Sequence, residues 1–359
     1  LVRMLVQDGT LRREGRRWVT TVEVAKLEMP PTIQVLLAAR IERLRPEERV
    51  VLERAAVIGR QFSRSAVAHL LPAGASDIDA RLESLRRSEL IEPDAGWYLG
   101  EPALRFHHVL IRDAAYRRML KERRAELHER LADWIEARGG ESAEREEALG
   151  WHLERAHRSL RELGPLDERG RGLGERAARH LGAAGRRALA REDLALAAGL
   201  LGRAIEALEP GHAVRAELAP DWCEALLAAG EVGAAARAID ELAHCSQGSE
   251  RLTAWHACFA GQLAALTDPQ SLHTTAERVA AAGERLAAAG DAAGEAKAHS
   301  VHAGALARLG AIGASEVALD RALVAARRAR DRRRAHAVLA GAPIAALWGP
   351  SPVTRASGR

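Results

Sequence analysis

The chain has 359 residues, nearly half of them hydrophobic but only 3% aromatic, and a formal net charge of +4. This length exceeds one small core, and charges of both signs are interspersed, which excludes the concentrated basic stripe of a strong nucleic-acid binder. Three cysteines are too few for a disulfide framework, and no apolar run reaches the roughly 18 residues of a membrane span. We therefore expect a soluble, cytoplasmic protein, and its length suggests two or three domains. Because Ala, Leu and Arg dominate, we expect it to be mainly α-helical.

The first 90 residues predict a helix end followed by three amphipathic helices. LVRMLVQDGTL is typical of a helix interior that reaches a turn at Asp8-Gly9, and a short polar segment follows up to residue 29. Pro30 then opens PPTIQVLLAARIERL, whose leucines and isoleucines fall on one face. Pro46 and Gly59 bound a second helix, and Ser76 is a candidate N-cap for the third, SDIDARLESLRRSELI.

The next segment has a different character. IEPDAGWYLG and ALRFHH are short apolar pieces separated by Pro, Asp and Gly, a pattern that predicts a small β-hairpin. Three helices followed by a hairpin are the layout of a winged helix. A single further helix is expected from about Val109 to Arg138, and the polar stretch RGGESAERE (138–146) predicts a domain boundary. The residues expected on the buried side of that helix are Leu120, Leu127, Leu131, Trp134 and Ile135.

From about residue 147 the sequence consists of alanine-rich helical hairpins. LGRAIEAL (201–208) recurs as AARAIDEL (235–242), with the two Arg-Ala-Ile triplets 34 residues apart, and DRALVAA (320–326) is a further echo. A period of about 34 residues is that of tetratricopeptide repeats. Gly185 and Leu201 follow the small-and-large pattern of a close helix crossing. We expect degenerate tetratricopeptide-like repeats, and a generic α-helical array is the alternative.

Three runs carry a family resemblance, namely MPPTIQVLLAARIERLRPEERVVLERAAVIGRQF, FHHVLIRDAAYRRMLKERRAELHERLADWIE and GWHLERAHRSLRELG. They resemble the central region of bacterial signal-transduction ATPases with numerous domains (STAND regulators). ALWGPSPV (346–353) is similar to a stretch in the repeat array of members that are fused to a class III adenylate or guanylate cyclase domain. The resemblance spans most of the chain and is strongest over 28–135.

The resemblance implies three parts. Residues 1–29 would be a remnant of the lid helices of an ATPase module, 30–138 a winged-helix domain with a relay helix, and 147–359 tetratricopeptide-like repeats truncated at the C-terminus. The P-loop part would precede Leu1, because no G-x-x-x-x-G-K-[ST] motif occurs in the sequence. ATP or ADP would therefore be the cofactor of an intact parent protein, and we expect no cofactor in this chain.

The pair His107-His108 stands where the wing is expected to end and the next helix to begin. In nucleotide-switch relatives a Met-His-Asp motif occupies this place, and its histidine contacts the phosphates of ADP. His108 matches that histidine, whereas His107 and Val109 replace the methionine and the acid. A histidine at a helix start suits phosphate, because it can donate a ring N–H beside free backbone N–H groups. The alternative is that His108 bonds only a neighbouring carbonyl and that His107 faces the wing or solvent.

The remaining candidate residues are expected to have structural roles. Arg112 and Asp113 should make surface or domain contacts. No Ser-His-Asp or Cys-His arrangement predicts a catalytic site, and no metal site is expected. One group of cysteines and histidines in the array could in principle be zinc ligands, namely His244, Cys245, His256 and Cys258. Its spacing fits no familiar zinc finger, and such residues on alanine-rich helices usually serve packing.

The sequence thus favours a non-catalytic regulatory fragment. The winged helix would couple the nucleotide state of an upstream ATPase module to the repeat array, which would bind a protein, a peptide or a small molecule. The parent protein would have a cyclase or transcriptional output. Two alternatives remain, a stand-alone repeat scaffold and a DNA-binding transcriptional regulator that would use Arg81, Arg86 and Arg87. Nucleic acid is not expected as a partner, because Glu83 and Glu89 lie among these arginines, and neither is a membrane.

Overall fold

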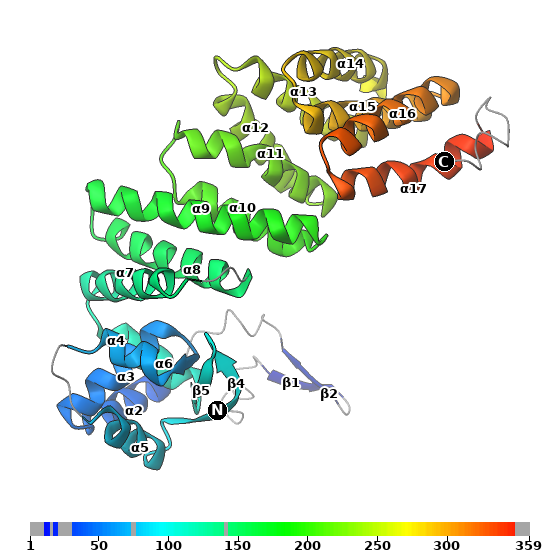
Figure 1. Cartoon of the computed structure of the whole chain (residues 1–359). Coiled ribbons are helices and arrows are strands. Elements are labelled where there is room, and N and C mark those ends of the chain that lie inside the picture. The colour runs from blue at the N-terminus through cyan, green and yellow to red at the C-terminus, as the bar shows by residue number, and fades with distance from the viewer. Residues whose placement is uncertain (1–10, 15–16, 21–30, 73–76, 140–142, 349–359) are drawn as a thin grey trace. The chain divides into compact units, whose positions relative to one another are not determined.

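The structure, a computed structural model, describes residues 11–14, 17–20, 31–72, 77–139 and 143–348 (Figure 1). Two compact units divide between Leu131 and Ala132. Most of the described residues are helical, and the strands form two small antiparallel sheets. The predicted fold class, mainly α with a winged helix and a helical repeat array, is confirmed.

The first unit contains a hairpin, a bundle of short helices and a three-stranded sheet. Its elements are β1 (Leu11–Glu14), β2 (Arg17–Thr20), α2 (Pro31–Glu42), α3 (Pro46–Ile58), β3 (Gln61–Ser63), α4 (Arg64–Leu70), α5 (Ile78–Arg87), β4 (Ile91–Tyr98), β5 (Glu101–Phe106), α6 (Val109–Arg118) and the start of α7 (Lys121–Ala137). The sheet has the order β3-β5-β4, with both pairs antiparallel. Helix α3, strand β3, helices α4 and α5, and the hairpin β4–β5 follow in the order of a winged helix.

Local chemistry explains why these elements form. Pro46 occupies the first turn of α3, and Glu48 accepts a hydrogen bond from the backbone N–H of Arg45 at 3.1 Å. The neighbouring Arg45 guanidinium lowers the pKa of Glu48 to about 2. Inside the unit, Phe62 of β3 and Phe106 of β5 are buried with their ring centroids 5.5 Å apart. These two rings fix the sheet against the helices.

Three sequence expectations for this unit need correction. Strands β1 and β2 pair where the sequence predicts only a short polar segment, because Trp18, Val19 and Thr20 favour strands. The other residues of 1–29 lie outside the described residues, and the assignment of 1–29 to the lid of an ATPase module stays a prediction. Ser76, the expected N-cap of α5, also lies outside them, and the N-cap position is Asp77. The segment 61–71, for which no element was predicted, contains β3 and α4.

The expected single helix from Val109 to Arg138 is two helices, α6 and α7. Met119 between them has extended backbone angles, and its side chain is buried against the guanidinium of Arg54. Leu120, expected on the buried side, is 75% exposed, whereas Leu127, Leu131 and Ile135 are buried as predicted. Packing of Met119 breaks the helix, and neither Gly nor Pro marks the place. The unit division falls within α7, and residues 143–146 of the predicted joint belong to the first turn of α8.

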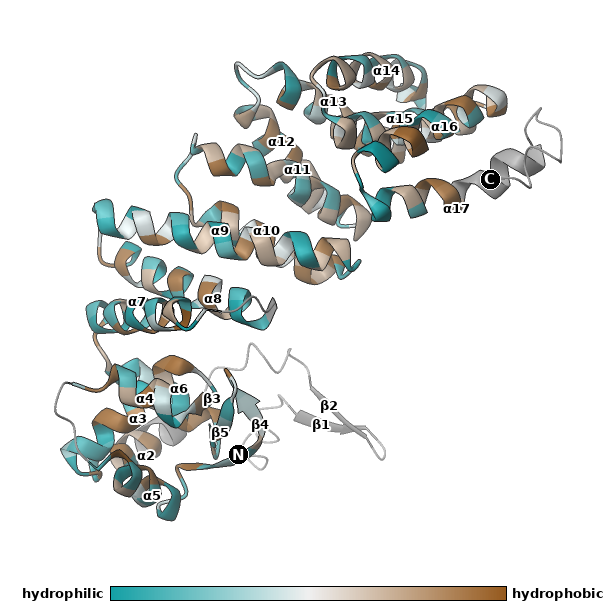
Figure 2. Cartoon of the chain, viewed as in Figure 1, coloured by the Kyte–Doolittle hydropathy of each residue, from teal (hydrophilic) through white to brown (hydrophobic). Residues whose placement is uncertain are grey.

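The second unit is an array of antiparallel helices. They are α8 (Ala143–Arg161), α9 (Glu168–Ala190), α10 (Leu194–Glu206), α11 (Ala213–Ala228), α12 (Val232–Cys245), α13 (Glu250–Thr267), η2 (Pro269–Ser271), α14 (Leu272–Ala288), α15 (Ala292–Arg308), α16 (Ile312–Arg328) and α17 (Arg332–Trp348). Each helix packs on the next, and α9, α11, α13, α15 and α17 also contact one another in turn. The odd-numbered helices therefore form one layer of a solenoid, which we call the inner layer. Figure 2 shows both hydrophilic and hydrophobic residues on each helix of the array, as expected when only one side is buried.

The helices are joined by tight turns and cross closely. Gly230, Gly290 and Gly310 occupy left-handed positions in turns, with φ of 76°, 71° and 77°. At the predicted crossing, a Cβ on Gly185 would lie 2.7 Å from Cγ of Leu201, so only glycine fits. The two Arg-Ala-Ile triplets do not fall at equivalent places, because Arg203 lies in the last turn of α10 and Arg237 in the first half of α12. The helices recur at more than 34 residues, since α10 and α12 begin at Leu194 and Val232. The repeat is regular in architecture and variable in length.

Within the described part of the chain, no helix combines the length and the apolar composition that a bilayer crossing needs.

Candidate functional site

His108, the sequence-predicted phosphate sensor, is the N-cap of α6. Its Nδ1 accepts a hydrogen bond from the backbone N–H of Leu110 at 3.2 Å, and its side chain is exposed. In the neutral ring this leaves the proton on Nε2, where it can be donated outward. The contact differs from the carbonyl bond considered as the alternative. His107 is also exposed and lies 3.2 Å from Oε2 of Glu92 on β4, that is, on the wing.

Arg112 and Asp113 make their observed contacts within the winged helix. The Nε of Arg112 donates to the carbonyl of Ala56 on α3 at 3.1 Å, and its Nη1 lies 2.9 Å from Asp113. The same guanidinium stands over the ring of Tyr116. Arg112 thus ties α6 to α3, and its predicted role as a contact to another domain stays a prediction.

The other residues considered in the sequence do not assemble into a site. His244 lies on α12 and contacts the carbonyl of Asp240, whereas Cys258 is packed in the core of the array. Burial raises the pKa of the Cys258 thiol to about 12, so it stays protonated. No three potential metal ligands come together among the residues that the structure describes. On α5, Arg86 pairs with Glu83 at 2.7 Å.

A cleft in the array is the feature best suited to bind a ligand. It is a cavity of about 560 Å³, within the range of small-molecule sites. Its lining comes from the odd-numbered helices and from the turn before α17. The lining residues are Arg186, Leu189, Ala190, Pro220, Asp221, Trp255, Ala293, Arg330, Asp331, Arg332, Arg333 and Arg334.

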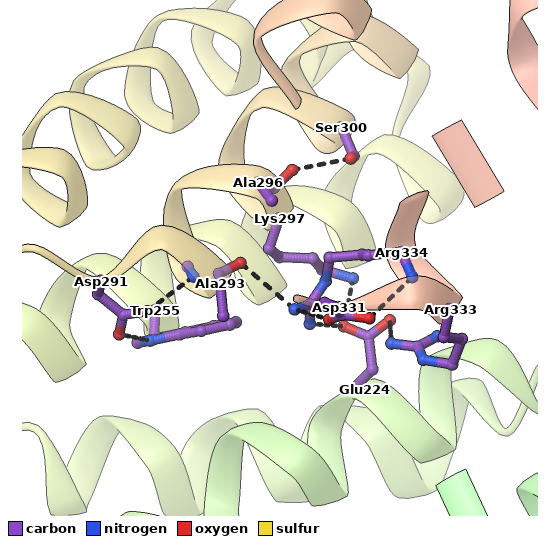
Figure 3. Close-up of polar contacts among 11 residues, drawn as sticks. Glu224, Trp255, Asp291, Ala293, Ala296, Lys297, Ser300, Asp331, Arg333 and Arg334 are labelled. Atoms are coloured by element: carbon purple, nitrogen blue, oxygen red, sulfur yellow. Dashed lines mark hydrogen bonds and ion pairs between the residues drawn. The ribbon is translucent and has the colours of Figure 1, made fainter. Parts of the chain in front are cut away.

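A buried carboxylate, Glu224 of α11, organises the charged side of this cleft (Figure 3). Its Oε2 lies 2.8 Å from Nζ of Lys297 on α15 and 3.2 Å from Arg334 on α17. Its Oε1 lies 3.0 Å from Arg333. Arg334 also pairs with Asp331 at 2.8 Å. One carboxylate thereby connects three helices of the inner layer. We call Glu224, Lys297, Asp331, Arg333 and Arg334 the Glu224 cluster.

The three surrounding cations hold the pKa of Glu224 far below its ordinary value, although burial alone would raise it. Burial and the neighbouring charge of Arg334 lower the pKa of Lys297, and Glu224 partly offsets this effect. The pKa of Arg334 is raised despite its burial, because Glu224 and Asp331 face it. Buried charges persist only when they are paired and hydrogen-bonded, so the cluster holds its members in fixed places.

Two aromatic residues of α13, Trp255 and Phe259, contact the cations of the Glu224 cluster. Trp255 lies beneath the guanidinium of Arg334 and stacks on Phe259 with ring centroids 5.5 Å apart. The indole N–H of Trp255 donates to Asp291 at 2.8 Å, and Asp291 accepts a second bond from Arg251 at 2.8 Å. The Trp255 ring therefore has a fixed position in the wall of the cleft.

The cleft combines an apolar wall with an excess of positive charge. Its lining contains five arginines and two aspartates, while Lys297 and Glu224 beneath it cancel each other. Arg330 and Arg332 are exposed and form no ion pair with any residue that the structure describes. The arrangement can bind an anion electrostatically, since guanidinium groups match carboxylate and phosphate geometry.

This cleft is not predictable from local sequence patterns. Arg334 and Glu224 are 110 residues apart in the chain, so no local pattern connects them. Two signals were present in the sequence, the arginine-rich run RDRRR (330–334) and the rare Lys297 in an alanine-rich helix. Charges at these positions are typical of solvated helix faces, and only the stacking of α11, α15 and α17 brings them together.

Comparisons with known proteins found a distant similarity to a solved structure. No protein-family model matches the sequence, and none of the curated proteins does. One solved structure that the chain resembles is that of a signal-transduction ATPase with numerous domains from Pyrococcus horikoshii, which has a tetratricopeptide repeat sensor. The identity is 13% and the TM-score 0.36, over 90% of this chain and 53% of the other. The chain thus spans about half the length of that protein.

Proposed function

We propose that this chain is a non-catalytic regulatory segment of a cytoplasmic signal-transduction protein. In this proposal the helical array binds a ligand or a partner protein on its inner layer. The winged helix relays the bound state to an ATPase module that precedes it. A cyclase or a transcriptional domain provides the output, and ATP or ADP is bound by the ATPase module alone.

The observation that carries this proposal is the cleft of the array. Five helices that are distant in sequence contribute its lining, and a buried charged cluster fixes their relative positions. A ligand held there contacts several repeats at once, so binding alters how α17 packs against α11 and α15. Stacked repeats suit this purpose because each contacts only its neighbours and a change at one interface passes to the next.

His108 supplies the second part of the proposal. It stands at the start of α6 with an exposed ring, and its Nε2 proton is available for a phosphate oxygen. With ADP bound, this contact would hold the winged helix against the ATPase module. Exchange for ATP, together with ligand on the array, would release it.

The proposal is tested by isolating the native protein from its source cells with an antibody raised against this chain. We expect a polypeptide larger than 38.7 kDa. Its tryptic peptides should include a P-loop sequence, and adenine nucleotide should co-purify with it. The recombinant chain by itself should neither bind nor hydrolyse ATP and is the matched control. A native polypeptide of 38.7 kDa without nucleotide would refute the proposal.

A further inference from the structure

We propose that the cleft beside the Glu224 cluster binds a small, multiply charged organic anion, such as a phosphate ester or a polycarboxylate. This inference rests on the proposed function in taking the array as the ligand-binding part, and it names the chemical class of the ligand. It is carried by the charge, the geometry and the size of the cleft.

The arginines that line the cleft outnumber its acidic residues. Each buried cation of the Glu224 cluster has a carboxylate within 3.2 Å, so the cluster itself needs no further anion. The surplus lies on Arg330, in the turn between α16 and α17, and on Arg332 at the start of α17; both side chains line the cleft and are exposed. Arg330 has a positive φ of 55°, a conformation that a non-glycine residue rarely adopts. An anion with two or more negative charges would neutralise these side chains.

Three arginines can contact such a ligand. Arg333 uses one amino nitrogen for Glu224, at 3.0 Å, which leaves other donors of its five. Arg332 precedes it in α17 and is exposed. Arg186 of α9 also lines the cleft and is positioned by Asp221, at 2.6 Å. The ligand would therefore bridge α9 and α17, the first and last helices that line the cleft.

The apolar wall selects an organic ligand over a free ion. Leu189, Pro220, Trp255 and Ala293 line the cleft together with the arginines. The Trp255 ring is held in place by its bond to Asp291, so it needs no reordering on binding. A compound with an anionic head and an aromatic or aliphatic body would satisfy both parts of the lining, whereas inorganic phosphate would use only one.

Isothermal titration of the full chain tests this inference with phenyl phosphate, citrate, inorganic phosphate and uncharged phenol as probes. We expect phenyl phosphate or citrate to bind, phenyl phosphate more tightly than inorganic phosphate, and phenol not at all. Whichever of the first two binds more tightly identifies the head group. Binding should weaken as sodium chloride is raised, because salt screens exposed charges.

Arg332→Ala is the informative variant, because this exposed side chain has no structural partner among the described residues. Loss of a charge-assisted contact should weaken binding about tenfold, and Arg332→Glu should weaken it further. Arg327→Ala removes an equal charge from an exposed position of α16 outside the cleft and should leave affinity unchanged. Circular dichroism would verify that each variant folds.

Two results would overturn the inference. They are the absence of binding by both organic anions, and equal losses in the Arg332→Ala and Arg327→Ala variants. Either result would remove this ligand class and leave the proposed function standing. A native protein without an ATPase module would remove the proposed function and leave anion binding intact.

Discussion

Glu224 joins three helices of the inner layer, α11, α15 and α17. It is buried, and Lys297, Arg333 and Arg334 all lie within 3.2 Å of its carboxylate oxygens. A buried ion pair contributes little relative to a well-packed apolar pair, but removal of one partner leaves an uncompensated charge in the interior. Here the loss of one carboxylate would leave three cations facing one another.

We therefore predict that Glu224→Gln destabilises the array by about 3–5 kcal/mol, the usual cost of breaking a buried pair. Urea unfolding followed by circular dichroism measures the free energy of unfolding. The matched control is Glu277→Gln on the exposed side of α14, which should change it by less than about 0.5 kcal/mol.

The destabilisation caused by Glu224→Gln should depend on pH. Because the folded-state pKa of Glu224 lies below its unfolded value, its carboxylate stabilises the protein above a pH of about 4.3. This stabilisation falls as the pH drops below about 5, so the difference between wild type and Glu224→Gln should shrink there. A difference that stays constant from neutral to acidic pH would show that the carboxylate is not stabilised in the fold.

Among the helices, glycine has opposite effects at two positions of one hairpin. On α9, a Cβ at Gly185 would meet Leu201 Cγ at 2.7 Å and the Leu201 backbone nitrogen at 3.3 Å. On α10, a Cβ at Gly199 would meet nothing within 4 Å. The first glycine is required by the close crossing of the helices, and the second only weakens its own helix.

Gly185→Ala should accordingly destabilise the array by about 1–3 kcal/mol through overpacking. Gly199→Ala should stabilise it by about 0.5–1 kcal/mol, since alanine loses less backbone entropy in a helix. Thermal and urea unfolding of the two variants compare the same chemical change within one helical hairpin. Effects of the same sign would contradict the packing described for this crossing.

Local sequence patterns were sufficient for some elements and insufficient for others. The wing was predictable because Gly100 separates the two short apolar pieces that form β4 and β5, and the hairpin α9–α10 because Gly185 and Leu201 show a repeat signature. The break between α6 and α7 was not, because Met119 is a good helix former and adopts an extended conformation only through its burial near Arg54. Tertiary packing decided that position.

Across the whole chain, the two candidate sites differ in how far the sequence predicts them. His108 was found from its place in a motif, and the structure adds its N-cap contact to Leu110. The cleft was not found, because its charged residues come from α11, α15 and α17 and acquire meaning only when the repeats stack. Long-range juxtaposition is what a solenoid creates, so its binding sites are poorly visible in a single sequence.

In the proposed relay, the winged helix responds to the nucleotide state of an ATPase module, and His108 is the residue that would contact the bound ADP. The most direct measurement is the release rate of a fluorescent ADP analogue from the native, P-loop-containing protein. We predict that His108→Ala accelerates release about tenfold, as expected for loss of a charge-assisted hydrogen bond, while His107→Ala on the wing leaves it unchanged. Equal release rates in wild type and His108→Ala, with both proteins folded, would contradict the relay.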